Sequence, residues 1–223
     1  MAPAATPSTT EASRPRGGDA FALTRALLYD LADIALTAAR RNGASYADVR
    51  IGETRREYAF AKDDRLENFD ERASQGFGLR VLLDGCWGFY GARRLDPLSL
   101  RDGVERALEN ARAVKRIQFQ PIALERLPAH EAEWIMPMGI DPLEVSAGEK
   151  ADLLLSIIAS ARDHGADFCS ASLSATCEER FFANSLGSRI HQTRTRVAPS
   201  FQATAIDRAS GRFATRDCLA PAR

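Results

Sequence analysis

The chain of 223 residues is poor in the residues that build metal centres and disulfide frameworks. It contains three histidines and four cysteines, and the cysteines show no CxxC spacing. So few and so widely spaced cysteines exclude a disulfide scaffold and favour reduced thiols. No apolar run approaches the roughly 20 residues needed to cross a bilayer, and the N-terminus lacks the apolar core of a secretory signal. We therefore expect a soluble, cytoplasmic protein with no membrane partner.

Net charge is absent as well, because 30 basic residues balance 30 acidic ones. No overall field draws the molecule toward nucleic acid, so we expect no direct nucleic-acid partner. Nearly all basic residues are arginines, with lysine only at Lys62, Lys115 and Lys150. We interpret this preference as the bias of a GC-rich genome rather than as an arginine-based binding surface. The run RIHQTRTR is interpreted in the same way, as a solvated surface.

Catalytic motifs are missing too. The stretch HEAEWI, which begins at His130, has Trp and Ile where HExxH or HExxxH requires histidine. His164 and His191 form no pair with metal-ligand spacing. Gly76 and Gly78 give GxG, but no third glycine opens a helix after them, which argues against a phosphate-binding loop. No GxSxG surrounds a serine. The sequence thus predicts no catalytic, cofactor-binding or metal-binding residue in this chain.

The first half of the chain shows a helical pattern and then an alternating one. Residues 1–20 are rich in Ala, Pro, Ser, Thr and Gly and predict a disordered tail. From Phe21, apolar residues recur at helical spacing as far as the dipeptide NG that ends the helix. Two alternating runs, residues 49–51 and 58–60, predict two strands joined by a polar turn. The charged segment KDDRLENFDERASQ is then expected to be a connection.

The stretch FGLRVLLDGCWGFYG predicts a β-hairpin. Asp84-Gly85 is a dipeptide preferred by a two-residue type I′ turn, which would pair Leu83 with Cys86 and continue outward from there. The neighbouring glycines are expected to leave room beside the two large aromatic side chains. The residues assigned to this structural hairpin are Gly76, Gly78, Asp84, Gly85, Trp87, Gly88 and Phe89.

A second helix, opened by a capping box of Ser99 and Asp102, is expected to end the first half of the chain and to run to about Lys115. Residues 119–145 contain prolines without periodicity and predict an irregular connection. A capping box of Ser146 and Glu149 then opens a third helix.

Alternating strands follow this third helix, as they follow the first. Two of them are expected near residues 189–197 and 201–206. We therefore predict an α/β protein of the α+β type with two sub-domains, residues 21–118 and 146–223. Each sub-domain is expected to be a helix packed on an antiparallel β-meander.

The segment YADVRIGETRREYAFAKDDRLENFDERASQGFGLRVLLDGCWGFYGARRL resembles the N-terminal region of the TldD/PmbA family of bacterial and archaeal metallopeptidases. The specific features are the ADVR strand, the glycine-spaced GFGLRV strand and DGCWGF at the turn. Further on, DPLEVSAGEK and FFANSLGSRIHQ resemble the second segment of the family. The resemblance covers roughly residues 21–215. The pattern DG-x-W-G-F is closer to the TldD branch than to the PmbA branch.

The resemblance implies a zinc peptidase that cleaves unfolded or short peptides inside a dimer of family members. In that family the zinc ligands are HExxxH and a distant cysteine of a C-terminal domain, and no residue of this chain matches them. The resemblance thus implies the chamber-forming part of the enzyme, from a truncated or split gene, with zinc only in the full-length family. We expect the chain to be inactive alone and to form a homo- or hetero-dimer with a TldD/PmbA protein.

Two alternatives remain open. The chain could be a non-enzymatic regulatory or assembly partner of a full-length homologue. It could also be a modulator of a DNA-processing enzyme.

Overall fold

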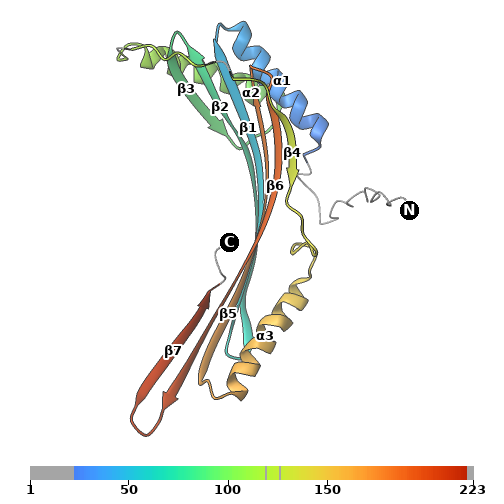
Figure 1. Ribbon diagram of the computed structural model, residues 1–223, viewed down its shortest axis with the longest axis vertical. Coiled ribbons are helices and arrows are strands. Elements are labelled where there is room, and N and C mark those ends of the chain that lie inside the picture. The colour runs from blue at the N-terminus through green and yellow to red at the C-terminus, as the bar shows by residue number, and fades with distance from the viewer. Residues whose placement is uncertain (1–22, 119, 126, 220–223) are drawn as a thin grey trace, which may run out of the picture.

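Three helices cover one face of a seven-stranded sheet in the computed structural model, which describes residues 23–118, 120–125 and 127–219 (Figure 1). The predicted α+β class, with a helix followed by strands in each half, is confirmed. The predicted disordered tail lies outside the described residues. Within the described part of the chain, no helix is long and apolar enough to cross a membrane.

The sheet joins the two halves of the chain edge to edge. Its strand order is β3-β2-β1-β5-β6-β4, with β7 also paired to β6, and every pair is antiparallel except β4 with β6. The central β1–β5 pair therefore connects the strands of the first half to those of the second. The elements are α1 (Arg25–Arg41), β1 (Tyr46–Lys62), β2 (Arg65–Leu83), β3 (Cys86–Ala92), α2 (Pro97–Val114), β4 (Glu131–Ile135), α3 (Ala147–Asp163), β5 (Phe168–Asn184), β6 (Arg189–Asp207) and β7 (Arg212–Leu219).

The strands are much longer than the sequence predicted. The two strands expected around residues 49–51 and 58–60 are one strand of 17 residues, and β2 begins inside the expected charged connection. The strands expected near residues 189–197 and 201–206 are likewise one strand, β6, of 19 residues. Those predictions were wrong because the middle of β1 and of β2 carries polar residues on both faces, whereas in β6 the expected break falls at Pro199. In the middle of β1 and β2 the alternation of apolar and polar residues that indicates a half-buried strand is lost, although the pairing of the backbone with neighbouring strands continues.

Local capping signals place the helices. Helix α1 ends before Gly43, whose φ of 88° is the left-handed conformation that favours glycine. The capping box predicted for α3 is confirmed, since the backbone N–H of Glu149 donates to Ser146 Oγ at 3.2 Å. The box predicted at Ser99 is wrong in register. Helix α2 begins two residues earlier, at Pro97, because a proline suits the first helical position and Asp96 caps the backbone N–H of Ser99.

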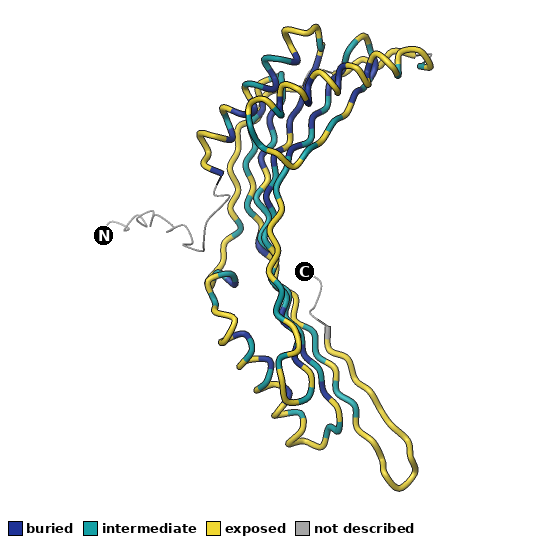
Figure 2. Tube along the Cα trace, turned by 180° about the vertical axis from the view of Figure 1, so that it is seen from behind, coloured by how far each residue is buried: buried dark blue, intermediate teal, exposed yellow. Residues whose placement is uncertain are grey.

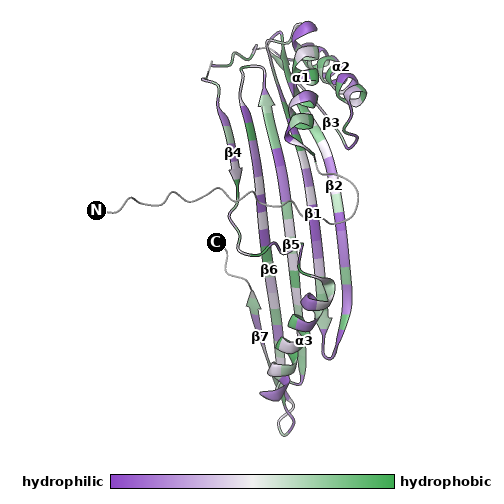
Figure 3. Cartoon of the chain, turned by 90° about the vertical axis from the view of Figure 1, so that its right-hand side faces the viewer, coloured by the Kyte–Doolittle hydropathy of each residue, from purple (hydrophilic) through white to green (hydrophobic). Residues whose placement is uncertain are grey.

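Two separate cores lie on the helix-covered face. Helices α1 and α2 pack on one end of the strands and enclose twenty buried residues, whereas α3 packs on the other end and encloses six. Figure 3 shows α1 and α3 over opposite ends of the sheet, with hydrophilic segments on the strands between them. We call this middle zone the polar waist. The sheet bends at the waist, so that its helix-free face is concave (Figure 1), and Figure 2 shows how few buried residues lie there.

The connection from α2 to β4 runs past the end of the sheet. The backbone N–H of Ile122 donates to Gly85 O at 2.8 Å, and that of Arg189 donates to His130 O at 2.8 Å.

Strand β4 lies within the segment for which the sequence predicted no regular structure. It pairs only with β6 and all five of its residues are exposed, so it shows no apolar alternation. His130 thus precedes a strand, and residues 131–135 of HEAEWI are extended.

Candidate functional site

The predicted hairpin forms between β2 and β3. Asp84 and Gly85 have φ values of 51° and 75°, as a type I′ turn requires. The predicted register is confirmed, with Leu83 opposite Cys86. Trp87 and Phe89 lie on the helix-free face, because they pair with Leu82 and Arg80 of β2.

The glycines of this hairpin have a different purpose from the one that the sequence suggested. A Cβ on Gly88 would lie 1.8 Å from the carbonyl oxygen of Ala107, so this glycine lets α2 approach the sheet rather than making room for Trp87 or Phe89. A Cβ on Gly76 would lie 2.7 Å from Ala92 O, in the neighbouring strand. A Cβ on Gly78 would meet nothing within 4 Å.

Trp87 shields a buried ion pair at the hairpin end of the concave face. Asp48 is fully buried and accepts a hydrogen bond from Arg80 Nε at 2.7 Å. The Arg80 guanidinium lies 4.6 Å from the centroid of the Trp87 ring, which itself packs edge-on against Tyr46. Burial, and then the Asp48 carboxylate, raise the pKa of Tyr46. Arg80 and Arg50, each 2.7 Å from a carboxylate oxygen of Asp48, compensate the charge of this buried side chain.

Arginines gather on the concave face, contrary to the interpretation of their abundance as genome bias alone. Alternation along the paired strands places every second residue of β1, β2, β5 and β6 on this face. Arg194 and Arg196 both lie on this face. Two basic residues of RIHQTRTR therefore share one face of a strand, which the sequence alone did not predict. Between the hairpin and the bulge at Phe60, the basic residues of this face are Arg50, Arg56, Arg72, Arg80, Arg180, Arg194 and Arg196, and the acidic ones are Asp48, Asp70 and Glu178.

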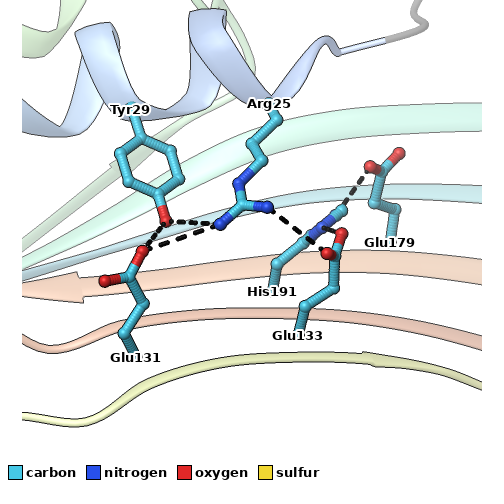
Figure 4. Close-up of polar contacts among 6 residues, drawn as sticks. All are labelled: Arg25, Tyr29, Glu131, Glu133, Glu179 and His191. Atoms are coloured by element: carbon cyan, nitrogen blue, oxygen red, sulfur yellow. Dashed lines mark hydrogen bonds and ion pairs between the residues drawn. The ribbon is translucent and has the colours of Figure 1, made fainter.

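A second polar cluster lies on the helix-covered face, where α1 meets β4 (Figure 4). Arg25 of α1 forms ion pairs with Glu131 at 3.6 Å and with Glu133 at 3.4 Å. The hydroxyl of Tyr29 donates to Glu131 at 3.0 Å. The cluster thus attaches an exposed five-residue strand to the first helix.

His191 of β6 completes this cluster. Its Nε2 lies 2.8 Å from Glu179 and its Nδ1 lies 3.2 Å from Glu133 (Figure 4). The hydrogen bond to Glu179 raises the pKa of His191, burial opposes this shift, and the bond to Glu133 adds to it. A protonated imidazole donates from both nitrogens, so it bridges two carboxylates that would otherwise repel.

The described residues do not fit a zinc centre. No group of three or more His, Cys, Asp or Glu side chains in residues 23–118, 120–125 and 127–219 is placed to hold a metal ion. Both ring nitrogens of His191 face carboxylates, and Nδ1 of His164 lies 2.7 Å from Ser160 O. The rings of His164 and His191 thus form hydrogen bonds within the protein.

Two family models match the chain on either side of its central connection. The PmbA/TldA metallopeptidase domain 1 matches residues 47–114, and the PmbA/TldA metallopeptidase central domain matches residues 140–217. This chain belongs to the PmbA/TldD family. The recognition made from the ADVR, GFGLRV and DGCWGF segments is thereby confirmed.

Two curated relatives of this PmbA/TldD chain are archaeal metalloproteases. One, from Methanothermobacter thermautotrophicus, is 28% identical over 78% of this chain and 37% of its own length. Another, from Methanocaldococcus jannaschii, is 26% identical over 68% of this chain and 34% of its own length. The matched region spans little more than a third of these relatives.

Three solved structures share the fold of this PmbA/TldD chain. A protein described as a modulator of DNA gyrase from Thermotoga maritima aligns with a TM-score of 0.68 at 19% identity, over 86% of this chain and 43% of its own. A protein described in the same way from Bacteroides thetaiotaomicron gives 0.60 at 15%, over 88% and 46%. TldE from Thermococcus kodakarensis gives 0.57 at 14%, over 86% and 42%.

The sequence analysis missed the arginines of the concave face. Their signal was present as basic residues two positions apart, as in Arg194 and Arg196. Such spacing defines a face only when the strand is known to be continuous, and the polar waist hid that continuity.

Proposed function

We propose that this chain is the chamber-forming part of a TldD-like zinc metallopeptidase and that its concave sheet face lines the space in which unfolded or short peptides lie. The observation that supports this most is the helix-free face itself. Long antiparallel strands expose arginines and aromatic rings such as Phe89 and Tyr58 on a bent, uncovered surface. A soluble protein rarely leaves such a surface without a ligand or a partner.

In this proposal the chain binds the peptide and shapes the chamber, and the metal chemistry belongs to another part of the assembled enzyme. We expect the chain alone to leave peptides intact, with or without added zinc. We also propose that it associates as a homo- or hetero-dimer with a TldD/PmbA protein in a cytoplasmic setting. Sedimentation velocity of the chain alone and mixed with a full-length homologue tests the association, and a monomer indifferent to the homologue would contradict it.

Photocrosslinking tests the peptide-binding role. A photoreactive residue placed at Thr176, on the concave face, is expected to capture a labelled unfolded peptide. The same residue at Ser156, on α3, is the matched control and should capture much less. Equal capture at both positions, or zinc-dependent cleavage of the peptide by the purified chain, would refute the proposed function.

A second candidate function is modulation of a DNA-processing enzyme, either directly or as a non-enzymatic partner of a homologue. It is favoured by the descriptions of two solved relatives as modulators of DNA gyrase. The balanced charge of the chain gives no electrostatic support for direct DNA contact. Salt-dependent binding of duplex DNA, without peptide binding, would favour this candidate over the peptidase role.

A further inference from the structure

Three arginines stand in one row across the concave face at the waist. In the sheet register, Arg72 of β2 lies opposite Arg56 of β1, Arg56 lies opposite Thr176 of β5, and Thr176 lies opposite Arg196 of β6. Alternation places all four side chains on the helix-free side. Adjacent strands are about 4.8 Å apart, so the row spans about 14 Å from Arg72 to Arg196.

The row is electrostatically costly in the isolated chain. Like charges directly opposite each other in a sheet are destabilising, and Arg56 faces Arg72 in this way. Their carboxylate partners are few: Asp70 lies 2.6 Å from Arg72, and Glu178 is shared between Arg180 at 3.1 Å and Arg196 at 3.4 Å. Among the described residues, Arg56 forms no ion pair within 4.0 Å and its side chain is exposed. A surplus of positive charge therefore faces the open side of the sheet.

We infer that this arginine row binds carboxylate side chains of an extended, acidic peptide segment. The inference rests on the proposed peptide-binding function and names the class of segment that the face prefers. Guanidinium groups pair with carboxylates through two parallel hydrogen bonds, and such a pair would relieve the repulsion between Arg56 and Arg72. In an extended peptide, acidic residues at positions i, i+2 and i+4 span about 13 Å, which matches the length of the row.

The surroundings of the row favour a peptide over nucleic acid. Thr54 and Ser74 on one side and Tyr58 and Ser174 on the other carry no charge, and the next arginine of β6, Arg194, lies opposite Glu178. Asp70 and Glu178 lie close beside it and would repel a continuous chain of phosphates. A DNA-binding surface neutralises several phosphates along a track, whereas this row offers three guanidiniums in one short line.

Fluorescence anisotropy with three unfolded peptides of equal length tests the inference. One peptide carries glutamate at alternate positions, one has glutamine in their place and one has lysine. At low salt we expect the acidic peptide to bind the purified chain about tenfold more tightly than the neutral one, and the basic peptide to bind least. The variant Arg56→Gln/Arg72→Gln is expected to lose most of this preference while keeping its affinity for the neutral peptide.

A matched charge variant and a melting curve test whether a general loss of positive charge or a loss of stability explains the result. Arg101→Gln/Arg112→Gln removes the same charge from exposed positions on α2 and should leave the preference intact. The row variant should melt close to the natural chain, because it removes the like-charge pair together with the exposed ion pair between Arg72 and Asp70.

The possible outcomes separate the inference from the proposed function. If acidic and neutral peptides bind equally, or if both variants lower the preference alike, the inference is overturned and the peptide-binding role stands. If no peptide binds at all, the proposed function fails. If duplex DNA binds, and the row variant weakens that binding instead, the row serves nucleic acid and the inference is wrong.

Discussion

His191 is the residue on which two carboxylates of different strands converge. Its ring lies between Glu179 of β5 and Glu133 of β4, and Arg25 of α1 approaches Glu133 from the other side. The raised pKa of His191 means that folding favours the protonated ring. The charged groups facing it are those two carboxylates, with Arg25 and Glu131 next to them. This single side chain therefore makes the attachment of β4 depend on pH.

The variant His191→Gln tests this dependence. Because the folded-state pKa lies above the ordinary value of 6.5, the stabilisation by His191 is complete below about pH 6.5 and is lost as pH rises through the folded pKa. Urea unfolding of the natural chain and the variant should thus differ most in mildly acidic buffer and converge at alkaline pH. His164→Gln serves as control, since Nδ1 of that ring lies 2.7 Å from Ser160 O of the preceding helix and not from a carboxylate. A difference that does not vary with pH would contradict the prediction.

Gly88 and Gly78 form a matched pair of glycines in neighbouring strands. Gly88→Ala pushes a Cβ against the backbone of α2 and is expected to destabilise the fold by about 3 kcal/mol. Gly78→Ala meets open space, and since glycine weakens a strand it should be neutral or stabilising by up to about 1 kcal/mol. Chemical denaturation of the two variants measures both values. Equal effects would mean that α2 does not press on the sheet at Gly88.

At the scale of elements, α3 is held by few contacts. It buries only Lys150, Leu154 and Ile158 against the sheet. Lys150 forms an ion pair with Glu57 of β1, and the two side chains are 4% and 12% exposed. A charge this deeply buried requires its partner. The ion pair thus joins the first turn of α3 to the edge of the polar waist.

Replacing one partner, and then both, tests how much this ion pair contributes to stability. Lys150→Ala leaves Glu57 buried without its partner and is expected to cost about 3 kcal/mol of unfolding free energy. Lys150→Met combined with Glu57→Leu replaces the pair by apolar groups and should recover most of that loss. If the double variant is as unstable as Lys150→Ala, the ion pair is not the main attachment of α3.

Two short strands pair with most of the outer edge of β6 and so shorten the part of this edge that is exposed. Residues 200–207 of β6 pair with β7, and residues 189–193 pair with β4. Among the described strands, residues 194–199 have a partner only in β5. Pro199 lies in this gap, and a proline is tolerated at a sheet edge because it lacks an N–H to donate.

At the scale of the whole molecule, one sheet carries two cores of unequal size. Among the described residues, the core formed with α1 and α2 contains twenty buried residues and the core formed with α3 contains six, with the polar waist between them. Local opening requires less free energy where fewer apolar side chains are buried.

We therefore expect the two ends of the sheet to open independently. In hydrogen exchange followed by mass spectrometry, amides of α3 should exchange faster than amides of α1 under native conditions. Both helices have 17 residues, so they are closely matched probes. Equal protection of the two helices would mean that the sheet couples both cores into one cooperative unit.

Much of the fold was predictable because its signals are local. The turn at Asp84-Gly85, the glycine after α1 and the capping box at Ser146 each depend on neighbouring residues. The length of β1 was not predictable, since nothing local distinguishes a polar strand centre from a polar turn. The concave face was missed for the same reason: a residue such as Arg56 acquires neighbours only through the register of three other strands.

The amino-acid sequence by itself determined the helices, the hairpin, the α+β class and the family, because caps, turns and periodicity act over a few residues and the family segments are contiguous. Only the tertiary structure decided that β1 and β5 join both halves into one sheet and that arginines far apart in the chain stand in one row. The physical reason is that strand pairing is a long-range interaction. Its partners are selected by burial across the whole sheet, and one residue of register changes which face every side chain occupies.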